Sequence, residues 1–304
     1  MQLLRRLTDG DGHPLTRRLR ALWGGDRPRL RAVDGGHAAT PWGESHVPGH
    51  YWGEWTAESL RAAQMVWGHS LLGPCSPDEL SLLAAWVKPR RGTRIALLGA
   101  GLGGFGLALS RICHCHVTGF EQADVLLRLC PDRRNGHLRS LDSITVKTEH
   151  SFDHVVIDGL GHRAGDIAPF LKPAAALASP RGWMIVRGYC VTDGAIRDGE
   201  RHRRWVETEP ARPRVPTRAE LLRQVERIGF EIIDEADTAD QHSAAIDACW
   251  APAVDLIRLV SAKKRQRTLI PHLIEEADRW RERVEMIKAG DLAVVELLTK
   301  RASS

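Results

Sequence analysis

From residue 94 onward, short apolar runs alternate with stretches whose apolar residues recur every three or four positions. A short continuous apolar run is typical of a strand buried on both faces, and the longer spacing is typical of a helix with one apolar face. Their alternation predicts an α/β fold in which helices cover both faces of a mostly parallel sheet. Seven strands are expected, at 94–98, 115–121, 144–149, 152–159, 183–189, 230–237 and 291–301.

Helical patterns also precede the first expected strand and separate the last two. Residues 56–72 and 76–87 predict helices, and the second opens with a strong start signal, Ser-Pro-Asp-Glu. Residues 239–288 are mostly helical, whereas residues 24–50 are rich in Gly, Pro and His and predict a loop or lid. We therefore expect a helical insert before the last strand and a lid over 49–90.

Composition narrows the protein class. The chain has 304 residues, of which 43% are hydrophobic and 27% charged, as is usual for a soluble globular protein with one elaborated domain. It has no run of about 18 apolar residues and no apolar core of a secretory signal near the N-terminus. These features predict a cytoplasmic protein.

The net charge of +5 is concentrated at the N-terminus. Residues 1–31 carry eight arginines and three aspartates, so this segment alone has the charge of the whole chain. Such a segment is typical of a solvated arm, or of an anchor for an anionic surface; Leu15, Leu19, Leu22 and Trp23 share one helical face, which favours lipid over nucleic acid. We expect an arm at 1–48, for which peripheral membrane contact is one of these two interpretations, no nucleic-acid binding, and a domain at 49–304.

The six cysteines do not predict a disulfide framework or a metal site. Their spacing is irregular in a large chain. The densest group, Cys113-His114-Cys115-His116, runs from an expected helix into an expected strand, where successive side chains point to opposite faces. No second ligand pair lies nearby at zinc spacing, and no metal is expected.

The strongest chemical motif is the glycine-rich segment after the first expected strand. Residues 99–104, GAGLGG, fit the G-x-G-x-x-G pattern, and Glu121 follows about 20 residues later. Glycines let the backbone approach a ligand, and an acid at that distance binds ribose hydroxyls. Two cofactor classes share this physics, namely dinucleotides and S-adenosylmethionine, and the motif alone does not separate them.

The order of the later elements separates them. About 90 residues precede the motif, SFDHVVIDG leads to a fourth strand, a Pro-Arg-Gly turn leads to a fifth, and the helical insert precedes the last. This order resembles the class I S-adenosylmethionine-dependent methyltransferases, in particular the small-molecule branch, over roughly residues 50–301. The resemblance implies a Rossmann-like, doubly wound, mostly parallel seven-stranded sheet, with S-adenosylmethionine as cofactor. A nicotinamide- or flavin-dependent oxidoreductase, supported only by the glycine pattern, is a weaker alternative.

The resemblance also implies roles for individual residues. The amino acid part of the cofactor would lie against Gly99, Ala100, Gly101 and Gly103. Glu121 would bind the ribose, with Gln122 beside the adenine, and Asp158 would lie near the sulfonium and the acceptor. The segment with Tyr51, Trp52 and Trp55 resembles a lid whose aromatic rings close over the ligands.

Two departures from the family pattern motivate an alternative function. The family usually has an acid two residues before the first glycine, where this chain has Leu97. Its loop between the third and fourth strands is usually longer and carries an acid for the adenine; here Glu149 is the local candidate. Two lost charged hydrogen bonds at about 1.5–3 kcal/mol each would weaken cofactor binding by roughly two to four orders of magnitude. The alternative is a degenerate member without catalysis that acts as a binding or scaffold partner.

Candidate groups for the acceptor lie after the fourth and fifth strands. His162 is placed to remove a proton, Asp158 to orient an amine, and Tyr189 to hydrogen-bond the acceptor. Residues 197–218 hold seven arginines, which predict either a clamp for an anionic acceptor or a solvated polar loop. We expect methyl transfer to nitrogen or oxygen of a small or lipid-like acceptor.

Overall fold

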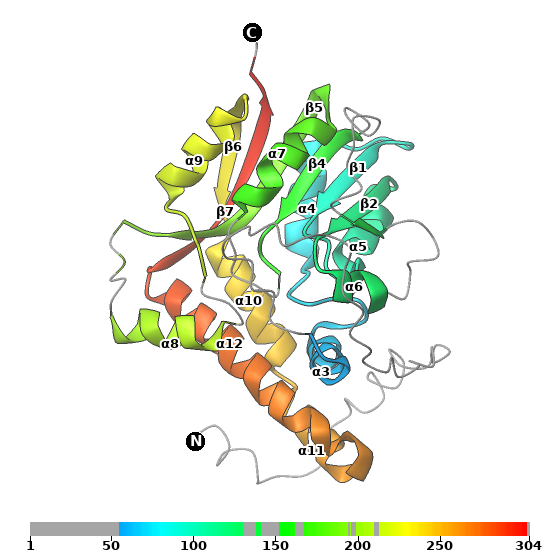
Figure 1. Cartoon of the computed structure of the whole chain (residues 1–304), viewed down its shortest axis with the longest axis vertical. Coiled ribbons are helices and arrows are strands. Elements are labelled where there is room, and N and C mark those ends of the chain that lie inside the picture. The colour runs from blue at the N-terminus through cyan, green and yellow to red at the C-terminus, as the bar shows by residue number, and fades with distance from the viewer. Residues whose placement is uncertain are drawn as a thin grey trace, which may run out of the picture. The chain divides into compact units, whose positions relative to one another are not determined.

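The structure is a computed structural model, and it describes residues 55–129, 138–140, 152–161, 167–193, 195, 199–209 and 213–302. The basic arm expected at 1–48 lies outside the described residues. In the described part, the helices and strands that follow one another from β1 to β7 form an α/β domain (Figure 1). The mostly parallel α/β sheet expected from the apolar runs is confirmed.

The strands lie in the order β3-β2-β1-β4-β5-β7-β6. Their bounds are β1 Arg94–Leu98, β2 His116–Glu121, β3 Leu138–Ser140, β4 Phe152–Asp158, β5 Ala178–Val191, β6 Phe230–Asp237 and β7 Leu292–Arg301. The pairs from β3 to β5 are parallel, and β7 is antiparallel to both of its neighbours. The strand order changes direction between β1 and β4: β2 and β3 follow on one side of β1, and β4 and β5 on the other. Open α/β sheets bind ligands at such a point.

Two of the expected strands differ from those observed. The expected third strand, 144–149, lies outside the described residues, and the edge of the sheet is formed by the short β3. The fifth strand begins before the expected turn at 180–182, which instead lies within β5, where the pairing with β4 changes register between Phe152 and His154. The irregularity lets the chain continue in an extended form where a Pro-Gly signal predicted a turn.

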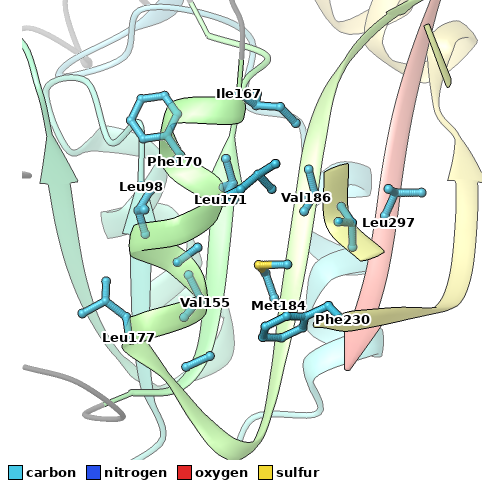
Figure 2. Packing of buried hydrophobic residues seen from close by; sticks show 14 of the residues in the cluster. Leu98, Val155, Ile167, Phe170, Leu171, Leu177, Met184, Val186, Phe230 and Leu297 are labelled. Carbon is cyan, nitrogen blue, oxygen red and sulfur yellow. The ribbon is translucent and has the colours of Figure 1, made fainter. Parts of the chain in front are cut away.

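Helices cover both faces of the sheet, as the alternation predicts. On one face lie α7 (Ala168–Leu177) and α9 (Arg218–Arg227), and on the other α4 (Pro77–Val87) and α5 (Gly104–Cys113) (Figure 1). Val155 of β4 packs toward α7 (Figure 2), and Ile157 belongs to the same cluster. Val156 between them belongs to the cluster on the other face, with α4 and α5. This period of two explains why the strands are apolar throughout: each face of the sheet is buried.

Side-chain caps fix where several helices begin. Thr56 before α3 (Ala57–Trp67), Ser76 before α4 and Thr217 before α9 each form a capping box. The remaining short helices are α6 (Asp124–Leu129) and α8 (Glu200–Thr208). The expected helical insert is present as α10 (Ala239–Trp250), α11 (Ala253–Ala262), the 3₁₀ helix η4 (Lys264–Leu269) and α12 (Ile270–Lys288).

The helix before the sheet packs against the insert. The indoles of Trp67 in α3 and Trp280 in α12 both donate to the same oxygen of buried Glu276, each at 2.8 Å. Their rings lie 4.6 Å apart, and Trp250 of α10 meets Trp67 edge-on at 6.0 Å. The helix before the first strand and the insert before the last strand therefore form one apolar core, which also contains Leu102 of the glycine motif.

Candidate functional site

The glycine motif forms a tight turn between β1 and α5. Gly99, Gly101 and Gly103 have φ values of 77°, 57° and 89°, in the left-handed region that favours glycine. The turn also lies against backbone: a Cβ at Gly99 would lie 2.6 Å from the carbonyl oxygen of Asp158, and one at Gly104 would lie 2.4 Å from that of Ser70. Glycine is therefore required here both by conformation and by close approach.

Glu121, the last residue of β2, completes the turn. Its Oε2 accepts a hydrogen bond from the backbone N–H of Gly101 at 2.7 Å, and its Oε1 accepts from Gln122 and Ala123 at 2.8 and 2.9 Å. The side chain is buried. The structure thus brings together the acid and the turn, which are 20 residues apart in sequence, as the motif predicts.

Gln122 follows Glu121 at the same edge. Its side-chain oxygen is buried and has no hydrogen-bond partner among the described residues. An unpaired buried acceptor is costly, so a position beside a ligand that can donate is the arrangement that would satisfy it. The exocyclic amino group of an adenine has this property, and the residues present fit an adenosine group.

Leu97 lies where the family usually has an acid. Its side chain is fully buried, in the apolar cluster formed with α4 and α5, and a Cβ at Gly106 would lie 3.1 Å from its Cδ2. Phe105, in the first turn of α5, belongs to the same cluster. Apolar packing replaces the charge at this position.

Asp158 ends β4 beside the turn. Its Oδ1 accepts from the backbone N–H of Leu160 at 3.3 Å and from Arg187 at 3.4 Å. Burial raises the pKa of the Asp158 carboxyl, and the positive charge of Arg187 only partly opposes this. Its side chain is 12% exposed. Asp158 therefore lies beside the glycine turn with part of its side chain exposed to solvent, and its role toward the cofactor and the acceptor stays a prediction.

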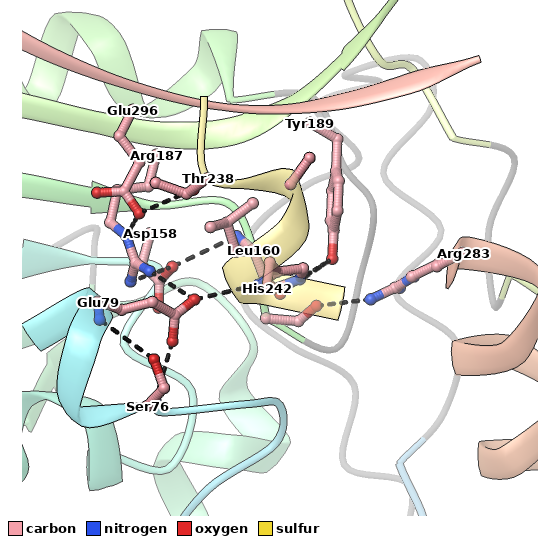
Figure 3. Close-up of polar contacts among 12 residues, drawn as sticks. Ser76, Glu79, Asp158, Leu160, Arg187, Tyr189, Thr238, His242, Arg283 and Glu296 are labelled. Carbon is pink, nitrogen blue, oxygen red and sulfur yellow. Dashed lines mark hydrogen bonds and ion pairs between the residues drawn. The ribbon is translucent and has the colours of Figure 1, made fainter. Parts of the chain in front are cut away.

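Arg187 of β5 lies at the centre of a buried ion cluster, which we call the Arg187 cluster: Glu79, Asp158, Arg187 and Glu296 (Figure 3). The guanidinium contacts Glu79 of α4 at 3.2 Å, Asp158 at 3.4 Å and Glu296 of β7 at 3.1 Å. Its carbon also lies 4.7 Å from the centre of the Phe105 ring. Three carboxylates thus surround one guanidinium at the carboxyl edge of the sheet.

The pKa values of the carboxyl groups in the Arg187 cluster are shifted in different directions. Burial alone would raise the pKa of Glu79, but the hydrogen bond from His242 and the charge of Arg187 lower it to about 2. Burial raises the pKa of Glu296 in spite of Arg187, and Oε2 of Glu296 has no partner among the described residues. Glu79 is therefore the carboxylate most firmly held in its charged form.

A hydrogen-bonded chain connects Glu79 to Tyr189. His242 of α10 lies 3.1 Å from Glu79 through Nδ1 and 2.8 Å from the Tyr189 hydroxyl through Nε2 (Figure 3). Because the Glu79 carboxylate can only accept, Nδ1 carries the proton when the imidazole is neutral, and the Tyr189 hydroxyl donates to Nε2. Burial raises the pKa of Tyr189. Tyr189, predicted as an acceptor contact, thus has its hydroxyl proton in a bond within the protein.

Arg283 of α12 extends this buried polar region. It makes a bidentate ion pair with Glu209, at 2.6 and 2.8 Å, and donates to the Gly161 carbonyl oxygen at 2.9 Å. Its guanidinium also lies over the rings of Trp280 and Tyr189. The helical insert therefore contacts the loop after β4, where acceptor-binding groups were predicted.

Sequence reasoning did not identify Glu79, Arg187, His242 or Glu296. A signal was present for two of them. Arg187 interrupts the apolar run WMIVRGYCV, and Glu296 interrupts LAVVELL. A charged side chain in a strand that is buried on both faces requires a partner of opposite charge. The sequence could therefore have predicted an ion pair between these two residues.

The structure describes only some of the residues predicted to form the lid, and it does not describe the predicted base. Tyr51, Trp52, Glu149 and His162 lie outside the described residues, and their roles stay predictions. Trp55 is described and is 8% exposed, in the cluster that contains Trp67 and Trp280.

The arginine-rich segment does not form a convergent clamp in its described part. It contains helix α8, and three of its arginines pair with carboxylates: Arg201 with Asp291, Arg204 with Glu200 and Glu282, and Arg218 with Glu235. These arginine side chains are about half exposed. The described arginines therefore agree better with the second interpretation of this segment, a solvated polar surface, than with a clamp for an anionic acceptor.

Within the described ranges, no cluster of His, Cys, Asp and Glu has the arrangement of a metal site. Cys113 ends α5, His114 follows in the left-handed conformation, and His116 starts β2. The same ranges contain no helix with the length and apolar character needed to span a bilayer.

Comparison with known proteins identifies the fold. No protein-family model and no curated protein matches the sequence. Among solved structures, phosphoethanolamine N-methyltransferase 2 of Haemonchus contortus, in complex with phosphomonomethylethanolamine and S-adenosylhomocysteine, is similar with a TM-score of 0.65 and 15% identity. The match covers 82% of this chain and 58% of that one, so this chain spans little more than half the length of the Haemonchus enzyme.

Two further structures match along nearly their whole length. An S-adenosylmethionine-dependent methyltransferase of Thiobacillus denitrificans, in complex with S-adenosylhomocysteine, has a TM-score of 0.55 and 14% identity over 80% of this chain and 97% of its own. A cyclopropane synthase of Mycobacterium tuberculosis has a TM-score of 0.58 and 12% identity over 80% and 94%. The described domain therefore has the fold of the class I S-adenosylmethionine-dependent methyltransferases.

Proposed function

We propose that the protein binds S-adenosylmethionine and transfers its methyl group to nitrogen or oxygen of a small or lipid-like acceptor. One observation carries the proposal: the Glu121 carboxylate accepts from Gly101 of the glycine turn, with the unpaired oxygen of Gln122 beside it. Glu121 would bind the ribose and Gln122 the adenine, while residues 99–103 lie against the amino acid part.

The strand order supports this cofactor over a dinucleotide. The usual dinucleotide-binding sheet has the order 3-2-1-4-5-6. Here the antiparallel β7 lies between β5 and β6. The similar structures that carry this fold bind S-adenosylmethionine or its product in several cases.

When bound, S-adenosylmethionine supplies a methyl group already activated by the sulfonium. The protein then has to align the acceptor, exclude water and, for some acceptors, remove a proton. Asp158, with its exposed edge beside the turn, is suited to orient an acceptor amine. His162 is the proposed base, and Tyr189 contributes through the buried chain that ends at Glu79.

Two fold neighbours support the proposed acceptor class. The Haemonchus enzyme is seen with a phosphomonomethylethanolamine, and another neighbour is a geranyl diphosphate methyltransferase. Both acceptors are small, and one is an isoprenoid, which agrees with a small or lipid-like class. The proposal includes a cytoplasmic location and peripheral membrane contact through the basic residues 1–48.

Calorimetric titration with S-adenosylmethionine tests the proposal. Binding at micromolar strength is expected for the native protein. Glu121→Gln exchanges an acceptor for a donor that faces backbone N–H groups, and at about 1.5–3 kcal/mol per lost charged bond it should weaken binding at least tenfold. Glu231→Gln, an exposed change on β6, should bind as the native protein does. Absence of heat and of a thermal shift at millimolar cofactor would refute the proposal.

A non-catalytic binding protein is the second candidate, and Leu97 favours it. The acid that the family usually has is absent, and the site is packed with apolar side chains. Leu97→Asp would restore an acid but would bury a charge among those side chains. We expect this change to destabilise the domain, so it is not a suitable test of cofactor binding. Methyl transfer from labelled S-adenosylmethionine to a panel of amine and hydroxyl acceptors separates the two candidates, because only the enzyme turns over.

A further inference from the structure

The loop after β4 is held by a side chain of the helical insert. Nη1 of Arg283 in α12 donates to the Gly161 carbonyl oxygen at 2.9 Å (Figure 3). Gly161 also lies beside other backbone, since a Cβ at Gly73 would lie 3.3 Å from its Cα, but open space borders its own Cβ position. The bond from Arg283 thus gives the loop a polar anchor at the residue that directly precedes His162, the proposed base.

The same side chain holds the end of α8. Nε and Nη2 of Arg283 donate to the two carboxylate oxygens of Glu209 at 2.6 and 2.8 Å, and the Trp205 indole donates to this carboxylate at 2.9 Å. The side chains of Arg283 and Glu209 are at most 1% exposed. Burial would lower the pKa of Arg283, but the charge of Glu209 raises it above its ordinary value, so Arg283 stays a cation.

A buried ion pair contributes less stability than its short distances suggest. Apolar residues of similar volume in place of both partners often leave stability unchanged or raise it. A bidentate pair, by contrast, fixes the relative orientation of its two groups. The guanidinium of Arg283 does this for two elements at once, because one nitrogen contacts the loop after β4 and the other two contact the end of α8. Acceptor contacts are predicted after β4 and after β5, and α8 lies in the connection that follows β5.

We propose that Arg283 is a positioning residue for the acceptor side of the site. It holds the loop after β4 and the end of α8 in one arrangement, and the helical insert thereby sets the geometry in which the acceptor meets the methyl donor. This inference rests on the proposed function. Other groups hold the proposed cofactor end, where the backbone N–H of Gly101 donates to Glu121. Loss of the arrangement should therefore affect the acceptor and leave the affinity for the cofactor unchanged.

Arg283→Lys tests the inference on the intact chain. Lysine keeps the positive charge but lacks the planar fork that donates to Glu209 and Gly161 together. Hydrogen exchange followed by mass spectrometry should become at least tenfold faster in the peptides that contain residues 158–161 and 200–209, as expected when a charged hydrogen bond is lost. Calorimetric titration should give the same Kd for S-adenosylmethionine as with the native protein.

Methyl transfer gives a second readout, with the acceptor that the native protein methylates in the panel of amines and hydroxyls. Arg283→Lys should raise the KM of this acceptor and lower its kcat/KM at least tenfold, while the KM of S-adenosylmethionine stays as in the native protein. A purely structural role would only reduce the amount of folded enzyme, which lowers the apparent kcat and leaves both KM values unchanged. That result overturns the inference, as does unchanged exchange at residues 158–161.

Two further variants make each outcome decisive. Arg204 also joins α8 to α12, through Glu282 at 3.4 Å, but its side chain is 48% exposed, and Arg204→Lys should leave exchange at residues 158–161 unchanged. If Arg283→Lys does not fold, Arg283→Gln with Glu209→Gln removes both buried charges together and should show the same local increase.

The failure of the inference differs from the failure of the proposed function. Exchange that is faster by the same factor throughout the domain overturns the inference alone, because it reports a general loss of stability. If the native protein neither binds S-adenosylmethionine nor methylates any acceptor of the panel, the proposed function is overturned, and the inference with it.

Discussion

Removal of the Arg187 guanidinium should be among the most damaging single changes in the domain. Arg187→Met keeps an unbranched side chain against Phe105 but removes three ion pairs at 3.1–3.4 Å. It leaves three carboxyl groups that are at most 12% exposed without their guanidinium partner. Breaking a buried pair costs about 3–5 kcal/mol, which is a large part of the 5–15 kcal/mol typical of a domain.

Urea denaturation followed by tryptophan fluorescence measures this loss, and Arg201→Met is the matched control. Arg201 pairs with Asp291 at 2.6 Å, a shorter distance than any in the Arg187 cluster, but its side chain is 45% exposed. Exposed pairs contribute about 0–1 kcal/mol. If burial rather than distance decides the effect, Arg187→Met loses at least about 2 kcal/mol more than Arg201→Met. Equal losses would refute this reasoning.

The pH dependence of the same loss has a definite sign. In Arg187→Met, burial still raises the pKa of Asp158 and Glu296, and the lowering by the guanidinium is gone. A group whose pKa is raised by folding stabilises the fold at low pH and loses that contribution as pH rises through the raised value. The gap between the native protein and the variant should therefore be wider at pH 8 than at pH 5. If Arg187→Met does not fold at neutral pH, Arg187→Met with Glu296→Gln should recover part of the stability.

Three further changes follow from buried contacts. Tyr189→Phe leaves Nε2 of buried His242 without its hydrogen-bond partner and should cost about 1–3 kcal/mol by urea denaturation, and no loss would contradict a stabilising hydrogen bond between the two side chains. Trp67→Phe removes a bond to buried Glu276 and should destabilise the domain by about 1–3 kcal/mol, whereas Trp86→Phe, whose indole contacts exposed Asp234, should cost less. Gly104→Ala puts a Cβ 2.4 Å from the Ser70 carbonyl oxygen and should lower the melting temperature and weaken cofactor binding; Gly161→Ala, with no atom within 4 Å, should do neither.

The sequence was informative where structure depends on short-range pattern. The strand–glycine–helix segment from Arg94 to Cys113 requires only local conformational rules, because left-handed φ values demand glycine and buried strands demand apolar runs. The position of Glu121 beside the turn follows from local rules as well, because one helix and one strand, α5 and β2, separate it from the glycine motif. These features were predicted correctly, and they position the proposed cofactor site.

The Arg187 cluster could not be assembled from such rules. Glu79, Asp158, Arg187 and Glu296 come from one helix and three strands and are separated by 29 to 109 residues from one member to the next. Glu79 was assigned to a helix start, which is correct, since its Oε2 accepts from the Ser76 backbone N–H. Its other oxygen contacts Arg187 and His242, and nothing local indicates this second use.

A crystal structure grown with S-adenosylmethionine tests the central claim most directly. The account predicts density for the ribose at the Glu121 carboxylate, for the adenine beside Gln122, and for the amino acid part along Gly99 to Gly103. Density at another place, or none at saturating cofactor with the turn as it is now and Leu97 and Phe105 filling the adjacent space, would contradict it.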